Sequence, residues 1–131
     1  MANGQLLHGA LTRSILGAFF EVYNELGFGF LEQIYVAALA DSLLRRGHRV
    51  ARELGVQVLF KGNEIGFQRL DVVVDDLVVV EVKSTANLAR VAPRQLYNYL
   101  RATRLEVGLL LHFGPEPKFY RLVYENRLKH E

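Results

Sequence analysis

The sequence contains no cysteine, no low-complexity tract and no proline- or serine-rich linker. Without cysteine the chain has no disulfide and no thiolate ligand for zinc or an iron–sulfur cluster, which suits a reducing compartment. No stretch approaches the roughly 18 unbroken apolar residues of a membrane span, and the N-terminus lacks the basic start and apolar core of a secretory signal. We therefore expect a cytoplasmic protein without a membrane partner.

Histidine is scarce and scattered, and the charge balance is nearly even. The four histidines show no pair at helical ligand spacing, so a histidine-rich zinc site is not expected. The formal net charge of +2 does not by itself indicate a nucleic-acid partner, which would need a local basic patch. A length of 131 residues with 50% hydrophobic content fits one domain, residues 1–131, with a sizeable core.

Hydrophobic periodicity changes along the chain and predicts an α/β protein. Steps of three and four residues indicate helices at about 9–26, 30–46 and 93–104, and glycines follow the first two. Alternating or continuous β-branched runs indicate one or two strands at 50–60 and further strands at about 65–74, 78–84, 106–113 and 118–124. The order ααβββαβ(β) predicts a mixed sheet flanked by helices.

Two acids and a lysine lie on neighbouring apolar strands. Glu81 and Lys83 are two residues apart, so they project from the same face of one strand, and Asp71 lies on the strand before it. A two-residue turn would pair position 71 with 80 and separate the acids. A three-residue turn or a bulge would pair 71 with 81 and bring them together. We predict the three-residue turn or the bulge.

Carboxylates gathered in this way favour Mg²⁺ or Mn²⁺, because these ions prefer hard oxygen ligands and retained water. Such a metal polarises a phosphate and lowers the pKa of bound water, and Lys83 would stabilise the transition state or position the attacking water. The alternative is a surface Glu–Lys pair, but the strand around Glu81 carries no other charge besides Lys83. The pattern therefore predicts a phosphodiester-cleaving centre.

The second helix carries the motif Gly29-x-x-Glu32-x-x-Tyr35 in an apolar stretch. Glu32 either points into the shared site as a third acid or simply stabilises the helix N-terminus, and the sequence does not separate these readings. Tyr35, three residues later, lies on a neighbouring face of the helix and is a candidate substrate contact.

The third helix is basic and amphipathic. Gln95 and Tyr99 lie one turn apart on the same face, where they would hydrogen-bond or stack with a nucleotide. Arg94 and Arg101 would hold a phosphate backbone. The alternative is an ordinary basic helix exposed to solvent. Because the helix directly follows the Glu-x-Lys strand, we weigh the two interpretations equally.

Taken together, these residues resemble the PD-(D/E)xK nuclease superfamily, over almost the whole chain. Asp71, Glu81 and Lys83 match its acid and acid-x-lysine positions, and Gln95-x-x-x-Tyr99 resembles the QxxxY motif of its RecB-like branch. More narrowly, Gly29, Glu32 and Tyr35 are similar to the motif of the GxxExxY proteins. Two features depart from the pattern: Leu70 replaces the proline before the aspartate, and no histidine precedes the glutamine.

The resemblance implies a restriction-endonuclease-like core and an Mg²⁺ or Mn²⁺ cofactor. It implies metal binding by Glu32, Asp71, Glu81 and the main-chain carbonyl of Val82, with Lys83 as the catalytic lysine. Gln95 and Tyr99 would contact substrate or support the site.

We expect a metal-dependent nuclease that cleaves DNA with low sequence specificity. A non-catalytic module that binds nucleic acid or protein, and a small-molecule hydrolase, are the alternatives. Four phenylalanines in the N-terminal helices allow either a monomer that buries them or a homodimer, and burial in the core is favoured: Phe19, Phe20, Phe28 and Phe30.

Overall fold

A computed structural model describes residues 6–129 of the chain. The helices are α1 (Gly9–Leu26), α2 (Glu32–Arg45) and α3 (Ala92–Ala102), with a short 3₁₀ turn η1 (Asn126–Leu128). The strands are β1 (Val50–Phe60), β2 (Asn63–Val74), β3 (Val78–Lys83), β4 (Val107–Phe113) and β5 (Pro117–Val123). The predicted element order is confirmed, with residues 50–60 forming one strand.

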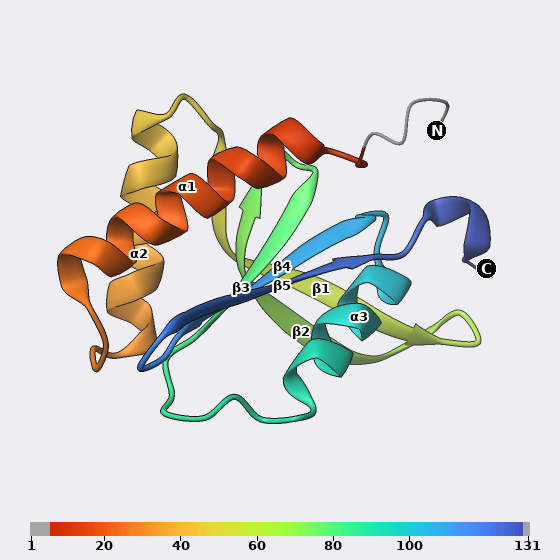
Figure 1. The fold of residues 1–131 in the computed structure, drawn as a ribbon. Helices are drawn as coiled ribbons and strands as arrows, with labels where there is room; N and C mark the ends of the chain where they lie inside the picture. Colours follow the sequence, from red (N-terminus) through yellow and green to blue (C-terminus); the bar gives the residue numbers. More distant parts are fainter. Residues whose placement is uncertain (1–5, 130–131) are drawn as a thin grey trace.

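The strands form one mixed five-stranded sheet in the order β1-β2-β3-β4-β5. Only the central β3–β4 pair is parallel; the others are antiparallel. Helices α1 and α2 cover one face and α3 crosses the other (Figure 1). This α+β arrangement, a mixed sheet flanked by helices, is a restriction-endonuclease-like fold, as predicted.

Alternation along β3 divides the interior into two layers. Val78, Val80 and Val82 pack beneath α1 and α2, whereas Val79 packs beneath α3. All four valines are fully buried, because β3 and β4 are covered on both faces. Glu81 falls on the α3 face, which is the only face of β3 that carries charge.

The turn between β2 and β3 has three residues, as predicted. Val74 pairs with Val78, and Asp75 and Asp76 adopt left-handed conformations with φ of 52° and 58°. The ladder continues to the Val72–Val80 pair, so one further step sets Asp71 opposite Glu81. The turn length thus places both acids on the same face of the sheet.

A polar relay holds this turn against α1. Ser14 Oγ lies 2.7 Å from His48 Nε2, and His48 Nδ1 lies 2.8 Å from Asp75 Oδ2. Asp75 Oδ1 also accepts from the Arg49 N–H at 2.8 Å. The order resembles a Ser–His–Asp hydrolase, but Ser14 lies inside α1, where main-chain N–H groups are used by the helix and are not free to hold an oxyanion. These hydrogen bonds have a structural role, which is to fix the β2–β3 turn against α1.

The outer halves of β1 and β2 form a ribbon that extends past the helices (Figure 1). Leu59, Phe60, Ile65 and Phe67 are exposed there, and β2 is largely buried only from Leu70 to its C-terminal end. The expected burial of the N-terminal phenylalanines is likewise correct only for Phe19, since the other three are at least 36% exposed. No helix in the described part of the chain is long and apolar enough to cross a bilayer.

Candidate active site

The acid pair lies where β2 separates from both neighbouring strands. The β2–β3 ladder ends at Val72–Val80, just before Asp71. On the other side, the β1–β2 ladder skips the Glu53–Asp71 pair, and Glu53 has a left-handed φ of 53°. This local separation leaves room around the Asp71 carboxylate on a sheet that is otherwise closely packed.

Asp71 is fixed from its partner strand. Its Oδ2 accepts a hydrogen bond from the Val82 main-chain N–H at 2.9 Å. Burial raises the pKa of Asp71 against the lowering effects of this hydrogen bond and of the Lys83 charge. Asp71 is therefore a positioned carboxylate that burial disfavours in its charged form.

Glu81 is the most perturbed acid of the site. Only 7% of the residue is exposed, and within residues 6–129 its Oε1 has no hydrogen-bond partner. Burial first, and then the negative charge of Asp71, raise the pKa of Glu81 to about 8, although the Lys83 ammonium lowers it. A buried carboxylate beside a half-buried one of like charge is unfavourable unless a proton or a cation compensates the charge.

Lys83 completes the central group. It is half-buried at the end of β3 and, two residues from Glu81, shares its face. Its charge lowers the pKa of both acids. The structure therefore brings Asp71, Glu81 and Lys83 together.

Glu32 lies beside this group without joining it directly. As the first residue of α2, it accepts a long hydrogen bond of 3.4 Å at Oε2 from the Ser84 N–H. Its charge contributes to the raised pKa of Glu81. Between residues 6 and 129, however, no three histidine, cysteine or acidic side chains cluster closely enough to hold a metal. A ready-made site of three carboxylates is thus not formed.

The residues present nevertheless suit a hard divalent cation. The unpartnered Glu81 Oε1 is a buried oxygen that needs a positive partner, and Asp71 supplies a second hard donor from the opposite strand. The main chain of Val82, whose N–H donates to Asp71, lies beside these two carboxyl groups. These groups would hold the ion.

Tyr35 holds the loop before α2. The residue is fully buried, its ring stacks on Phe113 with centroids 4.1 Å apart, and its hydroxyl donates to the Gly27 carbonyl at 2.5 Å. The same hydroxyl accepts from the Phe30 N–H at 3.2 Å. We expected Tyr35 to contact substrate, but its side chain is buried and instead positions the loop that leads to Glu32.

Helix α3 presents two different flanks. Tyr99 donates to Gln68 Oε1 at 2.9 Å, and its pKa is raised by burial and then by the charges of Glu81 and Asp71. Tyr99 therefore faces the acids. Gln95, one turn earlier on this flank, is exposed.

Arg94 and Arg101 lie on the other flank. Arg94 stacks over Tyr97 at 5.4 Å and Arg101 over Tyr124 at 5.8 Å. These tyrosines stack on each other with centroids 5.1 Å apart. The structure does not bring these two arginines beside Tyr99 and the acids, and their expected contacts with a phosphate backbone stay a prediction.

Two residues of the neighbourhood were not anticipated. His112 pairs with Lys83 across β3–β4, is 4% exposed, and its Nε2 lies 2.8 Å from the Thr85 carbonyl oxygen, which anchors the loop after β3. Gln68 supports Tyr99 from β2. A lone histidine and an exposed glutamine carry no spacing signal, although the position of His112 in the apolar 106–113 run was a usable hint.

The chain was compared with known proteins. A family model described as the PD-(D/E)XK nuclease superfamily matches residues 9–122. The chain belongs to this superfamily. PD-(D/E)XK proteins are commonly nucleases and usually use divalent metal ions, which agrees with the acids and the lysine gathered here.

A solved structure has a similar fold. The crystal structure of SSO0001 aligns with a TM-score of 0.57 and 14% sequence identity. The alignment covers 90% of this chain and 60% of SSO0001, so the present chain corresponds to part of that protein. No curated protein sequence matches the chain.

Proposed function

We propose that this protein is a divalent-metal-dependent nuclease that hydrolyses phosphodiester bonds of DNA with low sequence specificity. The observation that carries the proposal is the pair Asp71 and Glu81 beside Lys83. A buried acid with an unpartnered oxygen and a pKa raised to about 8, beside a half-buried second acid, is unfavourable for stability and favourable for binding a cation.

Each group has a role in this proposal. Asp71 and Glu81, with the Val82 carbonyl, would bind the ion, and Glu32 would join through water from its place at the start of α2. Bound Mg²⁺ or Mn²⁺ supplies charge stabilisation at the scissile phosphate and an acidified water. Lys83 would donate hydrogen bonds to the phosphoryl oxygens as negative charge develops there.

Helix α3 would support the substrate on the acid-facing flank. Gln95 is exposed and free to contact a nucleotide, and Tyr99 lies between Gln68 and the acids. Few groups here can read base edges, so phosphate contacts would dominate, with low sequence specificity and a strong salt dependence. The motif of Gly29, Glu32 and Tyr35 favours the narrower GxxExxY assignment within the superfamily.

The test is cleavage of a labelled DNA substrate by purified protein. The wild type should cut with Mg²⁺ or Mn²⁺ and stop when a chelator is added. Lys83→Ala should lower the rate at least 100-fold and keep the far-UV circular dichroism spectrum, whereas Lys61→Ala at the tip of the β1–β2 ribbon serves as the matched control and should cut normally.

A second function, binding without cleavage, would use the same fold. A wild type that binds DNA but never cuts DNA or RNA with either ion, and gains no thermal stability from them, would establish this alternative in place of the nuclease.

A further inference from the structure

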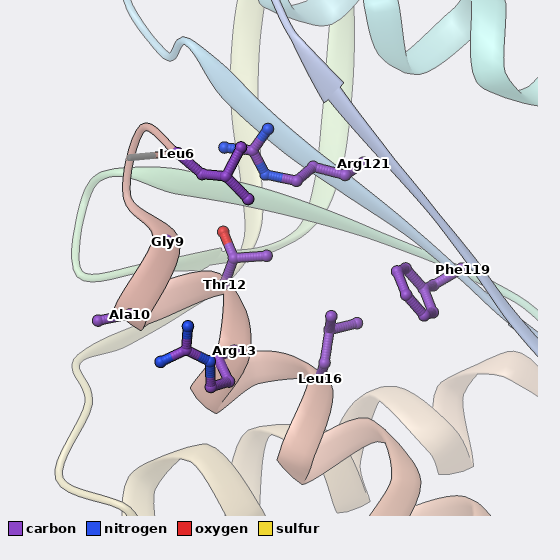
Figure 2. Close-up of a pocket in the computed structure, with 8 residues that line it drawn as sticks. All are labelled: Leu6, Gly9, Ala10, Thr12, Arg13, Leu16, Phe119 and Arg121. Carbon is purple, nitrogen blue, oxygen red and sulfur yellow. The ribbon is translucent and has the colours of Figure 1, made fainter. Parts of the chain in front are cut away.

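A second concave site lies on the opposite face of the sheet from the acid pair. It is a groove of about 600 Å³ between the first turns of α1 and strand β5 (Figure 2). Its β5 residues, Phe119 and Arg121, pair with Leu111 and Leu109, which belong to the core beneath α1 and α2. The groove is therefore separate from Asp71 and Glu81 on the α3 face.

Two polar groups in the groove lack partners. Thr12 is only 5% exposed, and its Oγ1 has no hydrogen-bond partner among residues 6–129. Arg121 donates from one terminal nitrogen to the Leu7 carbonyl at 2.6 Å, which fixes the guanidinium, but its buried Nε has no partner in the described part of the chain. Figure 2 shows both side chains projecting into the same space. Buried donors of this kind are costly unless a ligand satisfies them.

The surroundings are electropositive. Helix α1 begins at Gly9 without a side-chain cap and without an acid in its first turn, so no acidic side chain of that turn offsets the positive end of the helix dipole beside the groove. Arg13 adds a charge at the rim, and no acidic residue lines the groove. These features favour an anion.

The remaining walls are apolar. Leu6, Leu16 and Phe119 line the groove beside the polar end. Its volume falls within the roughly 300–1,000 Å³ typical of small-molecule sites. An inorganic anion would accept hydrogen bonds from Thr12 and Arg121 but would leave the apolar walls exposed to water. An uncharged lipid would cover the walls but would leave these donors without an acceptor.

We propose that this groove binds a small organic anion with an apolar body, of the medium-chain carboxylate type. Thr12 Oγ1 and Arg121 Nε hold the carboxylate, with Arg13 contributing charge from the rim. Leu16 and Phe119 cover the hydrocarbon part. The site is independent of the nuclease proposal.

The test is a titration of decanoate into ¹⁵N-labelled protein, followed by NMR. Saturable one-to-one binding should shift the signals of Thr12, Leu16 and the Arg121 side-chain N–H while leaving Tyr99 unmoved. 1-Decanol, which lacks the charge, and inorganic phosphate, which lacks the body, should each bind at least tenfold more weakly.

Variants locate the two halves of the site. Thr12→Val keeps the shape but removes the hydroxyl, and should weaken decanoate binding at least fivefold. Arg13→Gln, at an exposed position that folding does not need, should weaken it at least threefold, while Arg127→Gln near the C-terminus is the matched control and should change nothing. Non-saturable binding, decanol binding as tightly as decanoate, or unchanged affinity in both groove variants would overturn the proposal.

Discussion

The buried Glu81 carboxyl should make the metal-free protein lose stability as pH rises. The pKa of this group is raised from 4.5 to about 8 in the folded chain, so the folded state binds more protons than the unfolded state between these values. Its stabilising contribution is complete below the unfolded pKa and is lost as pH rises through the folded pKa. Each pH unit in that window changes the unfolding free energy by about 1.4 kcal/mol, on the order of 5 kcal/mol in all.

Glu81→Gln isolates this effect, because the amide keeps the shape and never ionises. Urea unfolding followed by circular dichroism in the presence of a chelator gives the free energy of unfolding of both proteins at each pH. The wild type should fall relative to Glu81→Gln from about pH 5 to pH 8, whereas the exposed Glu64→Gln should run parallel to the wild type. Parallel curves for wild type and Glu81→Gln would refute the argument, since the carboxyl would then not be kept neutral by burial.

Three further outcomes follow from individual contacts. Tyr35→Phe removes the hydroxyl that joins two main-chain groups, so the free energy of unfolding should fall by about 1–3 kcal/mol in chemical denaturation; an unchanged value would contradict the positioning role. Asp75→Asn should cost about 1–2 kcal/mol at pH 7, because it weakens the bond to His48. Burial raises the pKa of Asp75, but the Arg49 N–H bond and the contact with His48 together lower it by more, so the folded-state pKa lies below the ordinary value. The difference should therefore begin to shrink as pH falls below about 4 and be lost once pH has passed through the lowered pKa of the folded state, and a difference that stays constant would contradict the assignment. Gln95→Ala should slow DNA cleavage at least fivefold in a single-turnover assay while Arg101→Gln stays within twofold, and the reverse order would place substrate on the other flank of α3.

Local pattern was sufficient for most of the fold. The periodicity located the three α-helices and five strands to within a few residues, because the helices and the central strands β3 and β4 bury continuous apolar faces. Turn arithmetic also predicted the residue pairing that brings Asp71 and Glu81 to one face. The local sequence alone left the turn length open, and the prediction of a three-residue turn depended on the requirement that both acids share an ion.

The roles of individual site residues could not be predicted, because they depend on how the helices are oriented against the sheet. Arg94 and Tyr99 share α3, but which flank faces the acids depends on how the helix lies across the sheet, and that is set by contacts from β2 and β5. Tyr35 is polar at one atom only, so its sequence position could not distinguish a substrate contact from a buried bond to a loop. Phe60 and Phe67 of the β1–β2 ribbon lie in apolar sequence that is typical of a buried strand. They are exposed because the covering helices do not extend over the ribbon.

The most direct test of the active-site assignment is anomalous diffraction from a protein crystal soaked with Mn²⁺. The assignment predicts a peak between Asp71 and Glu81, with carboxylate oxygens at about 2.1 Å, and no peak there in a soaked crystal of Asp71→Asn. A well-ordered acid pair without anomalous density at saturating Mn²⁺, or density only at unrelated surface acids, would contradict it.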